Sequence, residues 1–193
     1  MTQSELEAQL KKELDKERYR HTIGVMYTAG SLAMAHGENL EKALLAGLLH
    51  DCAKCIPNEK KLKLCKKAGI PITEAEEKSP FLLHAKLGAY LAKENYDVTD
   101  EEILHAIRVH TTGAPGMNRL DQIIYIADYI EPNRNKAENL PLVRSMAFTD
   151  LEKTMQQILR DSLQYLSHSK ETIDPMTEET YRYFCEKNVA KET

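Results

Sequence analysis

A histidine and an aspartate, His50 and Asp51, follow directly on the most apolar stretch of the chain, residues 43–49. The leucines and alanines of that stretch predict a buried helix, and Gly47, one turn before the pair, would let a second helix approach closely. A buried imidazole and a buried carboxylate together raise the free energy of a fold unless something compensates them. The usual compensation is a metal ion, because both groups are good ligands for divalent transition metals.

Other candidate ligands lie at helix-compatible positions elsewhere in the chain. They are His21, His84, His110 and Asp128. Each falls in a predicted helix with an apolar face, and helical bundles build metal sites from side chains on facing helices. With His50 and Asp51 they provide six groups, enough ligands for two ions. Two divalent ions would leave this set of four imidazoles and two carboxylates net positive, which predicts an anionic ligand such as phosphate. Histidine-rich ligation favours iron, zinc or manganese over magnesium.

Helical patterns dominate the sequence, and strand-like alternation is nearly absent, so we predict an all-α fold in one domain. The expected helices cover about residues 4–36 (as one helix or two), 39–55, 57–69, 79–94, 99–110, 120–130, a short stretch after Pro141, 149–169 and 178–187. Capping-box spacing predicts that Thr99 and Thr149 each open a helix. Pro175 is expected to break the chain before the terminal helix.

The composition argues against several classes of protein. The formal net charge of −4 does not suit a nucleic-acid-binding module, and the basic run at residues 60–67 is interpreted as a solvated helix face. No apolar run reaches the ~18 residues of a membrane span, and the polar N-terminal segment is unlike a signal peptide. We therefore expect a cytoplasmic protein with no membrane partner and with reduced thiols.

The remaining histidines and cysteines have simpler interpretations. We expect His36, His105 and His168 to be core or surface residues with local hydrogen bonds. Cys52 and Cys55 have C-x-x-C spacing, but the βαβ context of a redox motif is missing. A zinc site would need four ligands, and only Cys65 is near, so these cysteines are interpreted as packed or partly exposed thiols.

The six candidate ligands resemble the ligand set of the HD-domain metallophosphohydrolases. The pattern of that superfamily is an early histidine, a His-Asp doublet and a distant aspartate, with two further histidines in the branch that binds two metal ions. In this chain the pattern is matched, in order, at His21, His50, Asp51, His84, His110 and Asp128. The resemblance extends from about Arg18 to Arg134.

The local motifs are similar to those of the YqeK family of bacterial proteins. They are RH at 20–21, LLHDCAK at 48–54, LHA at 83–85, HTTG at 110–113 and YIADYIEPNR at 125–134. That family is known as symmetrical bis(5′-nucleosyl)-tetraphosphatases with bound iron. The resemblance therefore implies hydrolysis of diadenosine tetraphosphate to two ADP at a di-iron centre, with manganese or another divalent metal as the alternative. It also implies a single HD-domain helical bundle over residues 1–193, with a metal-binding core at about 18–134 and a C-terminal helical extension at about 139–193.

The hypothesis gives roles to residues around the metals. Asp51 bridges the two ions, whose shared water attacks an inner phosphorus of the substrate. Lys54, on the helix face of the doublet, and Arg134 are expected to contact phosphate and to stabilise the leaving ADP, although both would also suit a solvated surface. Thr111, Thr112 and Gly113 are candidate phosphate-binding residues, and in the simpler interpretation Gly113 only ends a helix.

For two acidic neighbours of Asp128, the sequence gives a weaker indication of function than for the candidate ligands. Glu131, three residues after Asp128, is expected to support a metal ligand, and Asp121 to be an acid in the first turn of its helix. The aromatic segment with Tyr181, Tyr183 and Phe184 is predicted to be exposed on its own helix. It would pack either on the body of the protein or on a second copy in a homodimer.

Two other functions stay open. One is a different HD nucleotide phosphohydrolase, acting on deoxynucleoside triphosphates or alarmones. A cyclic-dinucleotide phosphodiesterase is less suitable, because the Gly-Tyr-Pro motif expected after its doublet does not occur here. The other is a non-catalytic nucleotide or metal sensor on the same scaffold. In each case the predicted partner is a small-molecule nucleotide, here a dinucleoside polyphosphate.

Overall fold

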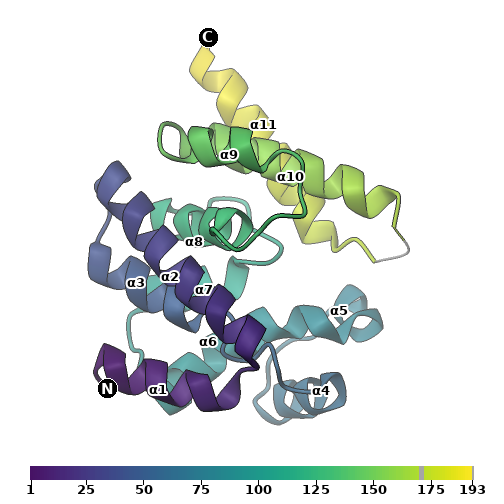
Figure 1. The fold of residues 1–193 in the computed structure, drawn as a ribbon. Coiled ribbons are helices and arrows are strands. Elements are labelled where there is room, and N and C mark those ends of the chain that lie inside the picture. Colours follow the sequence, from purple (N-terminus) through teal and green to yellow (C-terminus); the bar gives the residue numbers. More distant parts are fainter. Residues whose placement is uncertain (170–171, 193) are drawn as a thin grey trace.

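The computed structural model describes residues 1–169 and 172–192. Over these residues the chain forms helices joined by turns and contains no strand (Figure 1), so the prediction of an all-α fold is confirmed. In chain order the elements are α1 (Gln3–Glu13), α2 (Lys16–His36), α3 (Leu40–Leu49), α4 (Asn58–Lys67), α5 (Glu74–Lys78), the 3₁₀ turn η1 (Pro80–Leu82), α6 (Leu83–Tyr96), α7 (Glu101–Val109), α8 (Arg119–Ile130), α9 (Leu140–Ala147), α10 (Leu151–Ser167) and α11 (Pro175–Glu192).

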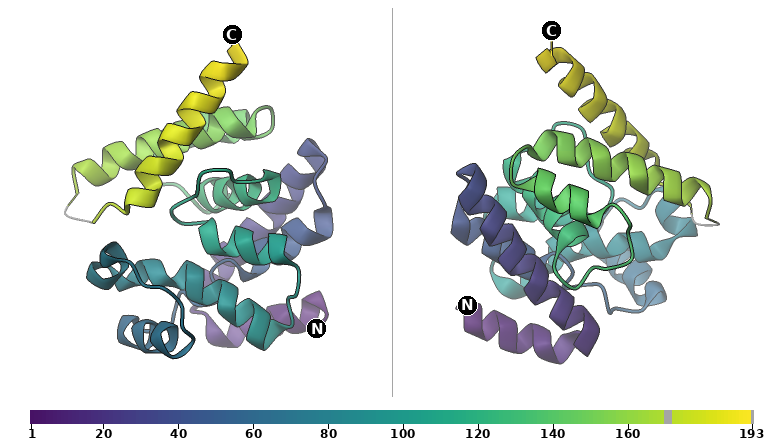
Figure 2. Two further views of the ribbon diagram at one scale, coloured as in Figure 1. Left: turned by 180° about the vertical axis from the view of Figure 1, so that it is seen from behind. Right: turned by 45° about the horizontal axis from the view of Figure 1, so that its top comes forward.

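Helices α2, α3, α7 and α8 pack against one another in the middle of the molecule, and α6 lies against α7 (Figures 1 and 2). The approach of α2 to α3 depends on Gly47, as the sequence predicted. A Cβ atom at Gly47 would lie 2.9 Å from the Cα atom of Met26 on α2, too close for any larger residue. This contact brings the end of α3, with its polar doublet, beside α2.

The C-terminal helices complete the same hydrophobic core. Helix α10 packs on α8, and α11 packs on α10. One cluster of buried apolar side chains runs from Leu6 to Phe184, and Phe184 is fully buried, so the aromatic segment of α11 packs on the body of its own chain. The domain boundaries expected from the sequence stay predictions. None of the described helices is long and apolar enough to cross a membrane, and the cellular location also stays a prediction.

The first residues of two helices differ from the sequence prediction. The caps of α7 and α10 are Asp100 and Asp150, each of which accepts a hydrogen bond from a backbone N–H in the first turn. Thr99 and Thr149 had been expected in these places. An aspartate carboxylate caps a helix at least as well as a threonine hydroxyl, so the start moves by one residue.

Other boundaries were also predicted wrongly. Helix α3 ends at Leu49, and residues 50–55 form turns. Helix α5 was not expected, and Pro175 is the first residue of α11 and not a break before it, because proline suits the first helical turn. The basic helix α4 is not wholly solvated, since Lys61 is buried and its ammonium donates to Oδ1 of Asn58 at 3.3 Å.

Candidate metal centre

The six candidate ligands converge on one site in the middle of the bundle. They come from α2, the end of α3, α6, the end of α7 and α8. His21, His50, Asp51, His84 and His110 are buried, and Asp128 is partly exposed. Ligands that lie more than a hundred positions apart in the sequence are therefore gathered by the packing of the central helices, as the sequence analysis required.

Asp51 lies between two pairs of histidines. Its Oδ1 is 3.2 Å from Nε2 of His84 and 3.5 Å from Nε2 of His110. Its Oδ2 is 3.5 Å from Nε2 of His50 and 3.9 Å from Nε2 of His21. Each carboxylate oxygen thus faces a different pair of imidazoles, which is the arrangement that a carboxylate shared by two metal ions needs.

Asp128 adds a second carboxylate on the side of His21. Its Oδ1 lies 3.0 Å from Nε2 of His21 and 4.0 Å from Nε2 of His50. Arg134 holds the same aspartate, because its Nη2 donates to Oδ1 at 2.6 Å and its Nε donates to the backbone carbonyl at 3.0 Å. His21, His50, Asp51 and Asp128 therefore form one group, and Asp51, His84 and His110 form another.

Local backbone contacts orient three of the imidazoles. Nδ1 of His50, His84 and His110 each lies 2.6–2.7 Å from the carbonyl oxygen of the residue three positions earlier. A carbonyl only accepts hydrogen bonds, so Nδ1 carries the proton and Nε2 keeps its lone pair for a ligand. His50 and His110 follow the last residues of α3 and α7, where backbone carbonyls lack helical partners. The ends of these helices thus aim Nε2 into the site.

His21 is oriented by a side chain from another helix. Its Nδ1 donates to Oε1 of Glu131 at 3.1 Å, while the other oxygen of this buried carboxylate accepts from the backbone and side-chain nitrogens of Asn133 at 2.7 and 2.9 Å. Glu131 was expected to support a metal ligand, and this hydrogen bond orients the candidate ligand His21.

The residues present fit divalent metal ions. Nε2 of His21, Nε2 of His50 and Oδ1 of Asp51 are buried and have no hydrogen-bond partner among the described residues. An unpaired buried acceptor costs roughly 1–3 kcal/mol, which a coordinated ion would remove. Three groups of three residues bring their ligand atoms within 4.8 Å of one another: His21, His50 and Asp51; His50, His110 and Asp128; and Asp51, His84 and His110.

The electrostatics of the site set the protonation states that metal ligands require. Burial by itself would raise the pKa of Asp51, but the imidazoles of His50, His110 and His84 outweigh it and hold that pKa well below its usual value. Burial lowers the pKa of His84 to about 4. At neutral pH the carboxylate is therefore ionised and His84 is neutral, the forms in which both bind metal.

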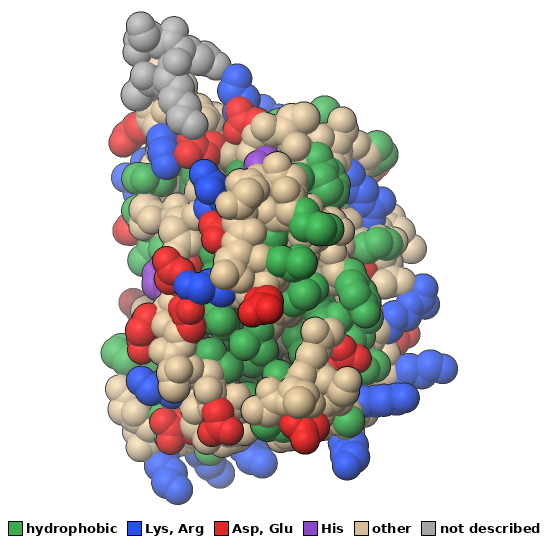
Figure 3. Space-filling model, turned by 90° about the vertical axis from the view of Figure 1, so that its left-hand side faces the viewer, with side chains coloured by type: hydrophobic (Ala, Val, Ile, Leu, Met, Phe, Trp, Pro, Cys, Tyr) green, Lys and Arg blue, Asp and Glu red, His purple; other side chains and the backbone are tan. Residues whose placement is uncertain are grey.

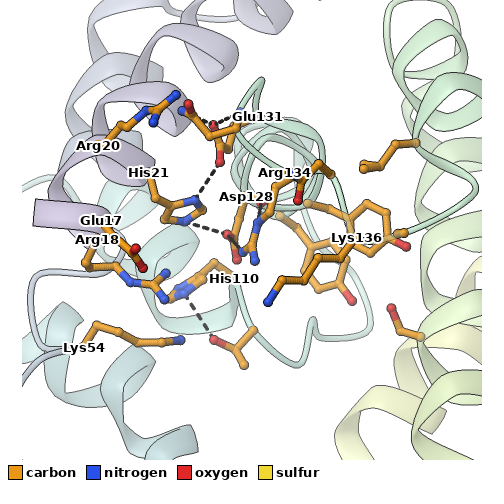
Figure 4. A pocket seen from close by; sticks show the side chains of 18 of the residues that line it. Glu17, Arg18, Arg20, His21, Lys54, His110, Asp128, Glu131, Arg134 and Lys136 are labelled. Atoms are coloured by element: carbon orange, nitrogen blue, oxygen red, sulfur yellow. Dashed lines mark hydrogen bonds and ion pairs between the residues drawn. The ribbon is translucent and has the colours of Figure 1, made fainter.

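A cavity of about 690 Å³ opens over the ligands and is rich in cations (Figure 4). Arg18 donates to Oδ2 of Asp51 at 2.7 Å, and the ammonium of Lys54 lies 3.6 Å from Oδ1. Arg20, Arg134 and Lys136 line the same cavity, together with Tyr125 and Tyr129 from α8. Such a lining suits a ligand with several phosphates and a flat ring.

Of the three residues in the predicted phosphate-binding turn after α7, only one lines the cavity. Thr111 lines it, and its hydroxyl oxygen lies 3.1 Å from Nε2 of His84. Thr112 and Gly113 do not line it. The Thr112 hydroxyl donates to the carbonyl of Gly113, and Gly113, with a φ of 71°, packs against Thr180 of α11.

Sequence reasoning predicted Lys54 and Arg134 but missed the other cationic residues and the tyrosines that line the cavity. Arg18 had a usable signal, because it precedes His21 by three residues and so shares its helix face. No sequence signal was available for Arg20, Lys136 and the two tyrosines, because tertiary packing decides which residues they face across the cavity.

The other histidines are hydrogen-bonded, but only His168 has the local partner that was expected, because the partners of His36 and His105 lie on other helices or at their ends. Nε2 of His36 lies 2.7 Å from the carbonyl of Ala147, and Nδ1 of His168 lies 2.7 Å from that of Gln164. Nδ1 of His105 lies 2.9 Å from Oδ1 of the buried Asp121. Asp121 is also part of a capping box in the first turn of α8, as its position predicted.

The cysteines are free thiols, buried at positions 52 and 65 and exposed at position 55. No group of candidate metal ligands in the described part of the chain includes any of them.

Comparison with known proteins agrees with this geometry. A family model described as HD domain matches residues 18–133. The chain belongs to the HD domain family. The match covers every candidate ligand and the Arg18–Asn133 segment that surrounds them, so the family resemblance read from the motifs is confirmed.

Relatives within the HD family share nearly the whole length of the chain. The symmetrical bis(5′-nucleosyl)-tetraphosphatase of Bacillus subtilis is 39% identical over 95% of this chain and 97% of its own. The protein of the same name from Halalkalibacterium halodurans is also 39% identical, over 89% and 91%. A crystal structure of a predicted HD superfamily hydrolase involved in NAD metabolism, from Clostridium acetobutylicum, superposes with a TM-score of 0.93 at 36% identity and covers 97% of this chain and 98% of that one.

Proposed function

We propose that this protein is a symmetrical bis(5′-nucleosyl)-tetraphosphatase, which hydrolyses dinucleoside polyphosphates and splits diadenosine tetraphosphate into two ADP. The observation that carries the proposal is the position of Asp51. It directs one oxygen to each of two histidine pairs beneath a cavity lined by arginine and lysine. The similarity to tetraphosphatases over almost the whole chain supports the same conclusion.

We further propose that the site binds two divalent metal ions, iron in the first place and manganese or another divalent metal as the alternative. His21, His50 and Asp128 would hold one ion, His84 and His110 the other, and Asp51 would be shared. When bound, such ions lower the pKa of a water and neutralise the oxygens of the attacked phosphate. Four imidazoles in the ligand set favour a transition metal over magnesium.

The cationic side chains of the cavity bind and orient the polyphosphate. Arg134 and Lys54, both predicted from the sequence, lie on either side of the ligand cluster, at Asp128 and Asp51 respectively. Arg18 lies at Asp51 as well. Guanidinium groups bind phosphate oxygens in pairs, so the two arginines fix the chain of phosphates, and Lys54 stabilises the negative charge that grows on the leaving ADP.

The proposed reaction adds one water across the central phosphoanhydride bond. The water oxygen forms a bond to the second phosphorus, and the bond from that phosphorus to the central bridging oxygen breaks. The bridging oxygen leaves with the other two phosphates as ADP, and the protons of the water pass to the products and solvent. No protein nucleophile is needed. Among the predicted phosphate-binding residues, Thr111 lines the cavity and would contact substrate directly, whereas Thr112 and Gly113 would shape the turn that carries it.

Product analysis tests this function. The metal-loaded protein is incubated with diadenosine tetraphosphate, and the nucleotides are separated by chromatography. Two ADP per substrate are expected. AMP with ATP would mean an asymmetric cut and would overturn the proposal. A parallel series with deoxynucleoside triphosphates and alarmones tests whether another HD nucleotide phosphohydrolase activity is the main one, and binding without turnover in the presence of iron would indicate a sensor.

A further inference from the structure

The solvent-facing side of α2 carries two large, exposed apolar side chains. Tyr27 and Met34 are 60% and 66% exposed, and they share one helix face with Arg20, Gly24 and Ser31. The steps between these residues are three or four positions, so they form a single stripe along the helix. The opposite face of α2 is buried in the core and carries His21.

A groove runs beside this stripe, between α2 and the chain from the end of α8 to the end of α9. It has a volume of about 530 Å³, and Ile23, Tyr27, Ile130, Pro132 and Phe148 contribute its apolar lining. Phe148 is 48% exposed. Figure 3 shows the neighbouring side of the molecule, where α3 and the C-terminal half of α2 lie, with hydrophobic side chains gathered in a broad band among charged ones. Contiguous apolar surface of this kind marks an interaction site.

We propose that a second copy of this chain covers the stripe and the groove, with the two α2 helices antiparallel about a two-fold axis that passes between Tyr27 and Ser31 on the exposed face, level with the buried Ala29. In such a pair, residue i of one copy faces the residue whose number is 58 − i in the other. The contact is isologous, so every pairing occurs twice. This surface differs from the Tyr181–Phe184 segment, whose Phe184 is buried within its own chain.

The register follows from charge at the two ends of the stripe. Arg20 lies about two and a half turns before Ala29, and Glu38 lies about the same distance after it, just past the end of α2. Neither has an ion-pair partner within the part of the chain that the structure describes. The antiparallel arrangement brings Arg20 of each copy to Glu38 of the other copy.

The same register fits the shapes of the apolar residues. Met34 projects from α2, and it faces Gly24 of the other copy, which lines the groove and whose own Cβ position is occupied by the carboxylate of Glu131. Tyr27 faces the small Ser31 of the other copy. The central side chains of the stripe thus alternate between large and small across the axis, and one rotation satisfies both the charges and the packing.

Sedimentation velocity on the full-length, metal-loaded protein tests the proposal, over a concentration range that spans the micromolar region. The wild type is expected to sediment as a dimer. Met34→Glu would put two carboxylates into the grooves and raise the dissociation constant by roughly thirtyfold or more, as for loss of a central interface residue. Tyr165→Glu is the matched control, because Tyr165 is 70% exposed on α10, outside the stripe, and this variant should stay dimeric.

Charge reversal gives the sharper test. Arg20→Glu and Glu38→Arg alone each place like charges opposite one another and should weaken the dimer, whereas the double variant Arg20→Glu/Glu38→Arg restores both ion pairs and should recover it. Circular dichroism confirms that each variant is folded. A monomeric wild type, a dimer that survives Met34→Glu, or a double variant no better than the single ones would each overturn the proposal.

Discussion

Nδ1 of His21 donates to Oε1 of Glu131 across the interface between α2 and the end of α8, at 3.1 Å. Glu131 is 1% exposed, and Asn133 holds its other oxygen, so the carboxylate has little freedom to move. Glu131→Gln keeps the size of the side chain and removes its charge. Loss of such a supporting partner typically costs 10–100-fold in metal affinity, and we expect a loss of about that size. Titration with metal and a chromophoric chelator measures it, with the exposed Glu138→Gln as control.

Removal of a candidate ligand imidazole should remove metal and activity together. His50 is fully buried, and its Nε2 has no partner other than the ligand cluster. We expect His50→Ala to purify with less metal than the wild type and to lose hydrolysis of diadenosine tetraphosphate. His168→Ala, at an exposed position, is the control for both readouts. Full activity in a metal-free His50→Ala protein would show that the metal is structural.

Gly24 on α2 is expected to tolerate no side chain. A Cβ atom there would clash with Oε2 of Glu131 and lie 3.2 Å from Nδ2 of Asn133. Gly24→Ala should therefore displace Glu131 from His21, lower the free energy of unfolding by about 1–3 kcal/mol and weaken metal binding. Gly88→Ala is the matched control, since its new Cβ would make only ordinary contacts of 3.5 Å and more. Urea unfolding of both variants at equal metal loading compares them.

Arg18 is expected to matter for catalysis although it is not a metal ligand. Its guanidinium bonds Asp51 at 2.7 Å and lines the cavity. Arg18→Met removes a charge-assisted hydrogen bond, and we expect kcat/KM for diadenosine tetraphosphate to fall roughly 10- to 100-fold while the metal stays bound. Arg108→Met, at an exposed position on α7, should leave kcat/KM unchanged. Steady-state kinetics together with metal analysis separates a loss of catalysis from a loss of metal.

The stability of the chelated protein should fall at acid pH because of His84. Burial lowers the pKa of this imidazole from 6.5 to about 4. Between these values the unfolded chain binds a proton that the folded chain does not, so the free energy of unfolding decreases as the pH drops from about 6.5 to about 4. The contribution of this one group is about 3 kcal/mol. Urea unfolding in chelator over this pH range measures it, and His84→Gln should flatten the profile whereas His168→Gln should not.

Much of the site was accessible from the sequence because the ligands carry their own signals. Helical patterns predicted the all-α fold. The His50-Asp51 doublet after an apolar helix, with the ordered His21, His84, His110 and Asp128, predicted the candidate ligand set that the structure brings together. Helix boundaries were less certain, because neighbouring residues such as Thr99 and Asp100 compete for the same cap and differ little in energy.

By itself, the sequence determined which family the chain belongs to, and it identified six candidate metal ligands together with the helices that carry them. The tertiary structure decided that the two oxygens of Asp51 face different histidine pairs, that Glu131 supports His21, and that Arg18 and Arg20 lie at the cavity while Thr112 and Gly113 do not. The physical reason is that sequence patterns report on residues close together in the chain, whereas the site depends on contacts between distant segments. The helical period fixes which side chains share a face, but which faces meet depends on close packing between segments far apart in the chain, such as α2 against Gly47 of α3.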